Sequence, residues 1–154
     1  MFIIFSGYDL DYNIKSYHLN QMADKFSKET RSRIMSSIRS KNTKPEITIR
    51  RLLWSRGIHY RIHDKSIFGN PDISSKKNKV AVFIDGCFWH GCKSCYQKPK
   101  TNTVFWNKKM TANRKRRSDV ISRLKNDGWN ILEIWEHDVK SRPNSVVERI
   151  SKML

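Results

Sequence analysis

Residues 80–92 read VAVFIDGCFWHGC, and this stretch decides the fold. Its first five residues are apolar without interruption, which is typical of a strand buried on both faces of a sheet. Asp85 and Gly86 then end the apolar run, and a loop rich in cysteine follows. We therefore predict a buried central strand, residues 80–84, whose C-terminal end leads directly into a loop that carries polar chemistry.

Apolar periodicity on both sides of this strand predicts the remaining elements. Helical spacing predicts helices over residues 30–40, 43–57, 105–125 and 145–154. Alternating or continuous apolar residues predict further strands over residues 58–62, 72–73 and 129–135. Thr43 and Glu46 form a capping-box pattern at the start of the second helix. The order of elements predicts an α/β fold, a mixed β-sheet flanked by helices.

The charge of the chain indicates a polyanionic partner. Its 154 residues hold 31 Lys and Arg against 14 Asp and Glu, a formal net charge of +17. Such a field attracts nucleic acid and accelerates the encounter with it. The alternative is a basic surface that only keeps the protein in solution.

Length and the opening residues predict the domain organisation. A chain of this size with 38% apolar residues fits one core, so we predict a single domain over residues 22–154. Residues 1–5 are apolar but too short for a signal peptide or a membrane span. We interpret residues 1–21 as a leader of uncertain status and assign it no function.

Two carboxylates follow turns at one expected sheet edge. Asp72 comes after Gly-Asn-Pro at residues 69–71, and Asp85 ends the next apolar strand. Paired carboxylates suit Mg²⁺, which supports phosphodiester hydrolysis, and Glu46 adds a third from the preceding helix. The alternative is that both aspartates are turn residues and that Glu46 is only a helix cap.

Three cysteines within nine residues indicate a metal site. Cys87, Cys92 and Cys95 are odd in number and closely spaced, in a chain without a secretory signal, which argues against a disulfide framework. Zn²⁺ in a structural role takes four such ligands, and His137 is a candidate for the fourth. The alternative is a set of buried free cysteines. A reducing, cytoplasmic location is expected.

Aromatic and basic residues near the cysteines suit DNA binding. Phe88, Trp89 and, farther along, Trp106 are candidates for insertion between base steps, although packing in the core is the alternative. Six basic residues of the following helix would contact phosphates: Lys108, Lys109, Arg114, Lys115, Arg116 and Arg117.

Several blocks together resemble the very short patch repair (Vsr) endonucleases. They are TRS at 30–32, GNPD at 69–72, VFIDGCFWHGC at 82–92, NTVFW at 102–106 and GWNILEIWEH at 128–137. The resemblance covers about residues 22–154, and the GCFWH block with its preceding strand is its most specific part. It implies a restriction-endonuclease-like core with a structural zinc site.

The resemblance also implies an activity. Vsr endonucleases make a Mg²⁺-dependent nick 5′ of the thymine in T:G mismatches, which arise from deamination of 5-methylcytosine. The implied partners are double-stranded DNA with a T:G mismatch, a cytosine-5 DNA methyltransferase and mismatch-repair proteins. We expect a monomer in the bacterial cytoplasm, associated with the nucleoid and with no membrane.

Site residues follow by matching positions. The candidate catalytic residues are Asp72, Asp85, His90 and Glu46. The candidate metal ligands are Asp72 and the backbone carbonyl of Ile84 for Mg²⁺, and Cys87, Cys92, Cys95 and His137 for Zn²⁺. The candidate DNA contacts are Met35, Phe88, Trp89, Trp106, Lys109, Asn113 and Arg116.

Two positions depart from the family pattern. Asp85 stands where the family has a second catalytic histidine, which leaves the general base open. Arg117 stands where members often carry aspartate. Two other functions remain open at this point: a restriction-like or mobile-element endonuclease on fully paired DNA, and a zinc-stapled DNA-binding protein without catalysis.

Overall fold

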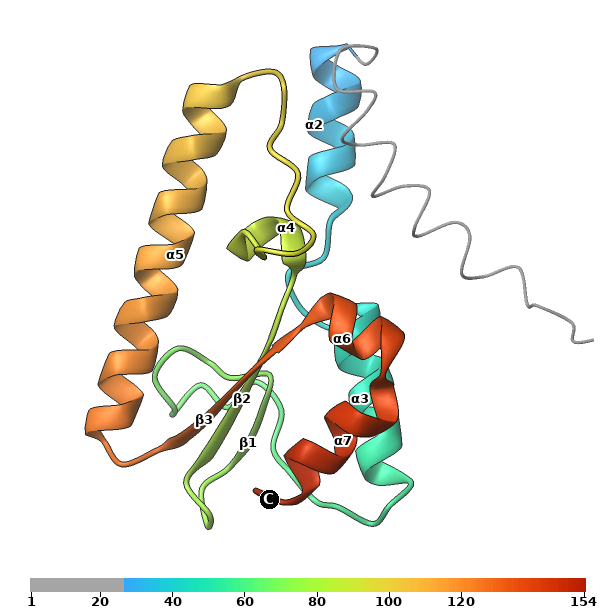
Figure 1. Ribbon diagram of the computed structural model, residues 1–154, viewed down its shortest axis with the longest axis vertical. Helices are drawn as coiled ribbons and strands as arrows, with labels where there is room; N and C mark the ends of the chain where they lie inside the picture. Colours follow the sequence, from blue (N-terminus) through green and yellow to red (C-terminus); the bar gives the residue numbers. More distant parts are fainter. Residues whose placement is uncertain (1–26) are drawn as a thin grey trace, which may run out of the picture. The chain divides into compact units, whose positions relative to one another are not determined.

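The computed structural model describes residues 27–154, and these fall into two compact units (Figure 1). One unit holds residues 27–38 and 97–107, and the other holds residues 39–96 and 108–154. The expected leader, residues 1–21, lies outside the described residues, and the single domain over residues 22–154 stays a prediction. No helix within residues 27–154 is both long enough and apolar enough to cross a bilayer.

The first unit contains helix α2 (Lys28–Ser37) and the start of helix α5 (Thr103–Asn126). Ser27 caps α2, because its Oγ accepts a hydrogen bond from the Thr30 N–H at 3.2 Å. The backbone of Ile38 is extended, so α2 ends three residues before the predicted boundary at residue 40. The helix predicted over residues 105–125 is confirmed as α5.

The second unit is built on a mixed sheet, as predicted, with three strands where the sequence predicted four (Figure 1). Its strands are β1 (Ile73–Ser75), β2 (Val80–Asp85) and β3 (Asn130–Trp135), in the order β1-β2-β3. Strand β1 runs antiparallel to β2, and β3 runs parallel to it. Strand β2 is therefore central, and all six of its residues are buried.

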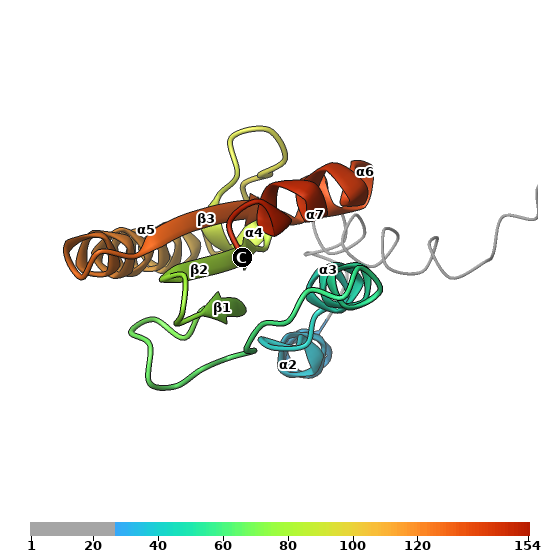
Figure 2. The same cartoon turned by 90° about the horizontal axis from the view of Figure 1, so that it is seen from below.

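Helices cover both faces of this sheet (Figure 2). Besides most of α5, the helices of this unit are α3 (Lys44–Trp54), α4 (Cys87–His90), α6 (Glu136–Ser141) and α7 (Pro143–Ser151). Side chains of β2 alternate between two apolar clusters, as the period of a strand requires. Val80, Val82 and Ile84 pack with α3, α6 and α7, whereas Ala81 and Phe83 pack with α5.

The strand predicted over residues 58–62 is wrong. Within that segment only Arg61 pairs with the sheet, through two backbone hydrogen bonds of 2.8 Å with Ser74. His63 then has a φ of +45°, a conformation that turns the chain away from an extended path. Ile62 is consequently half exposed, at 50%, and does not reach the core.

Helices α4 and α6 were not predicted. Helix α4 is a single turn closed by Gly91, whose φ of +63° places it in the left-handed region that favours glycine. Helix α6 begins directly after β3, with Glu136 and Asp138 in its first turn, where acidic side chains are favourable. The closing helix α7 begins at Pro143, two residues before the predicted start, because proline suits the first helical turn.

Candidate active site and metal centre

The strand pairing brings Asp72 and Asp85 to one edge of the sheet. Asp72 immediately precedes β1, and Asp85 ends the antiparallel neighbour β2. The Asp72 N–H donates to the Val82 carbonyl at 3.0 Å, and its Oδ2 accepts from the Ile84 N–H at 2.7 Å. The Asp72 side chain thus continues the hydrogen bonding to β2 beyond the point where the backbone pairing of β1 and β2 ends.

Asp72 carries negative charge in a poorly solvated place. Its side chain is 18% exposed. Burial, followed by the carboxylates of Glu46 and Asp85, raises the pKa of Asp72 to about 7, while the Ile84 N–H and Arg117 oppose this shift. A cation beside Asp72 would relieve this excess of negative charge.

Glu46 lies beside Asp72 and is fully engaged in hydrogen bonds. Its side chain is 3% exposed. Oε1 accepts from the Thr43 hydroxyl at 2.8 Å, and Oε2 accepts from Arg50 Nη2 at 2.6 Å and from the Asn42 N–H at 3.0 Å. The predicted capping box is confirmed. Glu46 therefore serves as a helix cap and also stands within the acidic edge.

His63 is a residue of this site that the sequence did not reveal. Ligand atoms of Glu46, His63 and Asp72 lie within 4.8 Å of one another, so the three could hold a metal ion. His63 Nε2 is 2.9 Å from Arg50 Nη2, and its Nδ1 is 3.8 Å from Asp72 Oδ1. In the sequence, His63 is simply one of the polar residues that alternate with apolar ones over residues 58–63, so nothing marks it as a site residue. The positive φ of His63, which turns its side chain toward the site, cannot be seen in the local sequence pattern.

Asp85, in contrast to Asp72, has a cation of the protein beside it. Its side chain is 4% exposed and forms an ion pair with Arg117, whose guanidinium also lies over the Phe83 ring at 4.2 Å. His90 Nε2 is 3.6 Å from Asp85 Oδ1. Burial lowers the pKa of His90, and Asp85 opposes that effect. The two unusual positions of the sequence, Asp85 and Arg117, are thus partners.

Helix α5 fixes the loop that carries the two adjacent aromatic candidates. Phe88 and Trp89 are half-buried in α4, with their rings edge to face at 5.2 Å. The Asn113 side-chain amide donates to the Trp89 carbonyl at 3.0 Å, and Arg114 donates to the Gly91 carbonyl at 3.1 Å. Asn113 is 7% exposed, so its amide is engaged inside the protein.

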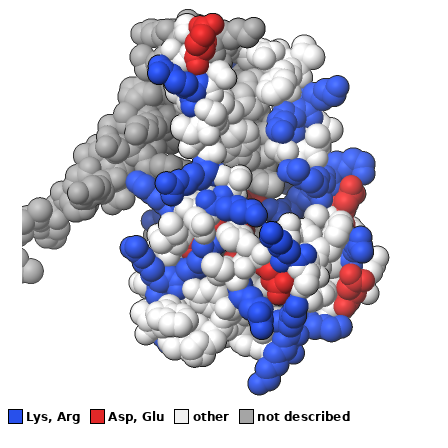
Figure 3. All heavy atoms as spheres, turned by 180° about the vertical axis from the view of Figure 1, so that it is seen from behind, with Lys and Arg blue, Asp and Glu red and all other residues white. Residues whose placement is uncertain are grey.

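The other candidate DNA contacts lie on helices. Met35 of α2 and Trp106 of α5 are both half-buried and belong to the first unit. Lys109 and Arg116 of α5 are exposed, as phosphate contacts require. Figure 3 shows many Lys and Arg side chains on one face of the molecule and few carboxylates.

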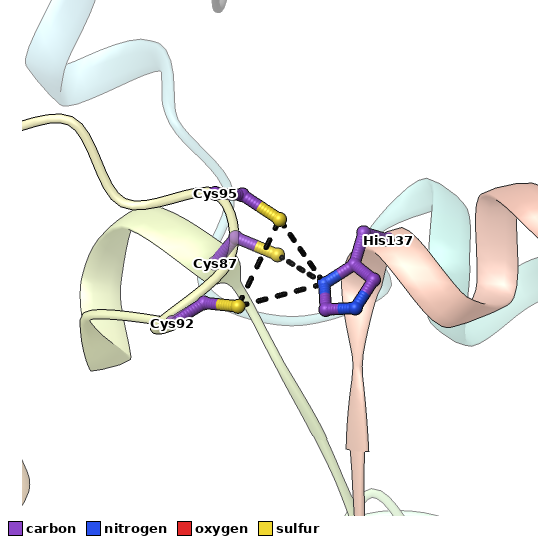
Figure 4. A group of neighbouring side chains, drawn as sticks. All are labelled: Cys87, Cys92, Cys95 and His137. Carbon is purple, nitrogen blue, oxygen red and sulfur yellow. Dashed lines mark hydrogen bonds between the residues drawn. The ribbon is translucent and has the colours of Figure 1, made fainter.

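The three cysteines and His137 converge on one point (Figure 4). His137 Nδ1 is 3.2 Å from Cys87 Sγ, 3.6 Å from Cys92 Sγ and 3.2 Å from Cys95 Sγ. The Sγ atoms of Cys92 and Cys95 are 3.7 Å apart, and all three cysteines are free. Helix α4 and the loop after it supply the three cysteines, and α6 supplies His137, so the group could hold a metal ion.

Comparisons with known proteins define the family. The family model for the DNA mismatch endonuclease Vsr matches residues 23–97. The Escherichia coli DNA mismatch endonuclease Vsr is 36% identical over 135 residues, which cover 86% of this chain and 86% of the relative. The chain belongs to the Vsr family. It is therefore a DNA endonuclease, a hydrolase of phosphodiester bonds, and not a DNA-binding protein without catalysis.

Other Vsr-like relatives carry a different name. The type II nicking enzyme V.NmeDIP of Neisseria meningitidis serogroup C is 42% identical over 130 residues, which cover 82% of this chain and 87% of the relative. The type II nicking enzyme V.HpaIIP of Haemophilus parainfluenzae is 40% identical over 134 residues, which cover 85% and 95%.

Proposed function

We propose that this Vsr-family chain is a Mg²⁺-dependent endonuclease that nicks DNA 5′ of the thymine in T:G mismatches. One observation carries the proposal: Asp72, a largely buried carboxylate with a strongly raised pKa, stands at the same sheet edge as the Asp85–His90 pair. Such an edge suits the binding of a cation and of a phosphate together.

Asp72 and the backbone carbonyl of Ile84 are the proposed Mg²⁺ ligands. The residues fit the ion, because Asp72 offers a hard oxygen, Oδ1, which lies 3.8 Å from His63 Nδ1. When bound, Mg²⁺ neutralises the charge that develops on the phosphate and lowers the pKa of a bound water. Glu46, in the first turn of α3, adds negative charge next to Asp72.

His90 is the proposed proton carrier of the reaction. Its Nε2 faces Asp85 Oδ1, so the carboxylate orients the ring and stabilises its charged form. Asp85 acts in this proposal through His90 and not as a metal ligand, because Arg117 already neutralises it.

The aromatic loop is the proposed reader of the mismatch. Phe88 and Trp89 stand on a turn that α5 holds by hydrogen bonds, which suits wedges that enter between base steps. Mismatched bases are easier to unstack than paired ones, so deformation provides selectivity. We assign Met35 and Trp106 to further base contacts, and Lys109 and Arg116 to phosphates. Asn113 positions Trp89.

Zn²⁺ is the proposed ion of the cysteine cluster. A tetrahedral zinc site places two sulfurs about 3.8 Å apart and a sulfur and a nitrogen about 3.6 Å apart. The distances of 3.7 Å and of 3.2 to 3.6 Å agree with those values. Zinc here would join α4 to α6 and so fix the end of β2 that carries Asp85.

A second candidate function is nicking of fully paired DNA. The names of V.NmeDIP and V.HpaIIP, type II nicking enzymes, favour it. The two candidates imply different partners: T:G repair couples the enzyme to a cytosine-5 DNA methyltransferase and to mismatch-repair proteins, whereas nicking of paired DNA requires neither.

End-labelled duplexes that differ only in one T:G or C:G pair, assayed with and without Mg²⁺, test the proposal. We expect a nick 5′ of the thymine only with T:G and Mg²⁺, and at least a thousand-fold slower nicking by Asp72→Ala, roughly the effect of losing a main electrostatic group. His59→Ala, which changes an exposed histidine outside the site, should nick normally. Equal nicking of both duplexes would favour the second candidate, and rapid nicking by Asp72→Ala would refute the site.

A further inference from the structure

His63 stands between a fixed arginine and the proposed metal-binding carboxylate. Its side chain is 15% exposed. Arg50 Nη2 lies 2.9 Å from its Nε2, and Asp72 Oδ1 lies 3.8 Å from its Nδ1. Glu46 Oε2 also lies 3.4 Å from Nε2, so Nε2 faces the Arg50–Glu46 ion pair, whereas Nδ1 faces the Asp72 carboxylate.

Arg50 determines which nitrogen of His63 carries the proton. A guanidinium has only donors and stays charged at all relevant pH values, so its N–H can only donate to a ring nitrogen that has a free lone pair. The Arg50 contact of 2.9 Å is shorter than the 3.4 Å from Nε2 to Glu46 Oε2, so the tautomer that satisfies it leaves Nε2 unprotonated and places the proton of the neutral ring on Nδ1. The Nδ1–H consequently faces the Asp72 carboxylate.

Arg50 is itself held in place from several sides. Its Nη2 donates to Glu46 Oε2 at 2.6 Å, and its Nη1 donates to Asn42 Oδ1 at 2.7 Å. Its backbone carbonyl accepts from the Tyr60 hydroxyl at 2.8 Å. A long side chain with this many partners loses its rotamer freedom, so the orientation that it imposes on His63 is well defined.

We propose that Arg50 and His63 are positioning residues for Asp72, and that His63 holds Asp72 Oδ1 from outside the ligand set of the metal. The Ile84 N–H already holds Oδ2 at 2.7 Å, and the Nδ1–H, which at 3.8 Å from Oδ1 is beyond hydrogen-bond distance, would restrain the other oxygen electrostatically. Hydrogen-bonded partners behind a metal ligand typically raise metal affinity or activity 10- to 100-fold. This inference rests on the proposed function, in which Asp72 binds the divalent ion.

Direct ligation by His63 is the competing arrangement, since Glu46, His63 and Asp72 are close enough to share an ion. Two contacts oppose it. The Nε2 lone pair is taken by Arg50, and the same guanidinium lies 2.6 Å from Glu46 Oε2, where it would repel a metal cation. Mg²⁺ also prefers oxygen to imidazole nitrogen.

Binding of Mn²⁺ to the zinc-loaded full-length protein, measured by electron paramagnetic resonance, tests the positioning role. Mn²⁺ shares the preference of Mg²⁺ for oxygen ligands and reports free and bound ion directly. We expect His63→Ala to weaken Mn²⁺ binding about ten-fold or more. His63→Asn, whose amide N–H replaces the Nδ1–H, should recover most of the affinity, and Arg50→Met should weaken binding because the tautomer is then no longer fixed. His59→Ala is the matched control.

Pulsed electron paramagnetic resonance of the Mn²⁺-bound wild type provides a second measurement. We expect no coupling to a directly coordinated nitrogen, and such a coupling would make His63 a ligand and overturn the inference. Unchanged affinity in both His63→Ala and His63→Asn would overturn it as well. Asp72→Ala separates this failure from that of the proposed function: if Asp72→Ala binds Mn²⁺ like the wild type, the metal assignment itself is wrong, whereas loss in Asp72→Ala alone refutes only the role of His63.

Discussion

Asp72→Asn should stabilise the magnesium-free protein above neutral pH while it abolishes nicking. The aspartate side chain is 18% exposed, and burial, followed by the carboxylates of Glu46 and Asp85, raises its pKa from the ordinary 3.8 to about 7. A raised pKa means that the folded state favours the protonated form. The contribution of Asp72 to stability is thus fully present below about pH 3.8 and is lost as the pH rises through 7.

The size of this effect follows from the shift. One pKa unit is about 1.4 kcal/mol, so a shift from 3.8 to about 7 sets an upper limit of about 4 kcal/mol above pH 7. Partial exposure screens the charge, and we expect about 2 kcal/mol at pH 8. Asparagine has the same shape and no charge, and its amide oxygen still accepts from the Ile84 N–H.

Urea unfolding of wild type and Asp72→Asn in magnesium-free buffer, with zinc retained, measures the free energy of unfolding at pH 5 and pH 8. The advantage of the variant should be larger at pH 8. Addition of Mg²⁺ should reduce the advantage, because only the wild type gains a bound ion. Asp119→Asn, which changes an aspartate side chain 59% exposed, is the control and should change stability by less than about 0.5 kcal/mol. A variant that is less stable than wild type at pH 8, or an advantage independent of pH, would refute the reasoning.

Two other perturbations test the parts around the acidic edge. Arg117→Met should lower the free energy of unfolding by about 3 kcal/mol, because it leaves Asp85 buried without its cation. Adding Asp85→Asn to the same chain should recover most of this loss, as measured by denaturant titration. Removal of zinc by a chelator, or Cys92→Ser, should lower the melting temperature and slow nicking in parallel, and wild-type melting after complete zinc removal would contradict a structural role for the cluster.

The central sheet was predictable because its signals are local. The apolar run at residues 80–84 identifies a strand with both faces covered, and the structure buries every residue of β2. The turn residues before Asp72 and after Asp85 place both carboxylates at strand ends. Antiparallel pairing of β1 and β2 then brings those ends together. Patterns within about fifteen residues were sufficient for this part of the site.

The segment at residues 58–62 shows where local pattern fails. Its alternation is that of a strand, but a strand needs a partner along its length, and only Arg61 finds one. Helix α6 was missed for the opposite reason: six residues are too few to display a helical period, although Glu136 and Asp138 were available as a start signal.

The cations of the site were not predictable from spacing. Arg117 is 32 positions from Asp85, and it reaches that carboxylate only because α5 packs on the face of β2 that carries Phe83. In a chain with 31 basic residues, nothing local distinguishes Arg117 or Arg50 from a solvated side chain. Their roles depend on tertiary distances.

These two arginines decide where a metal ion can bind. Arg50 forms an ion pair with Glu46, and Arg117 forms one with Asp85, whereas the group that faces Asp72 Oδ1 is His63. In the proposed site, a divalent ion would therefore be drawn to Asp72 rather than to Glu46 or Asp85. Mg²⁺ held by so few protein oxygens draws its remaining ligands from water and phosphate. In the proposed enzyme, DNA would thus complete the metal site, and strong metal binding would follow arrival of the substrate.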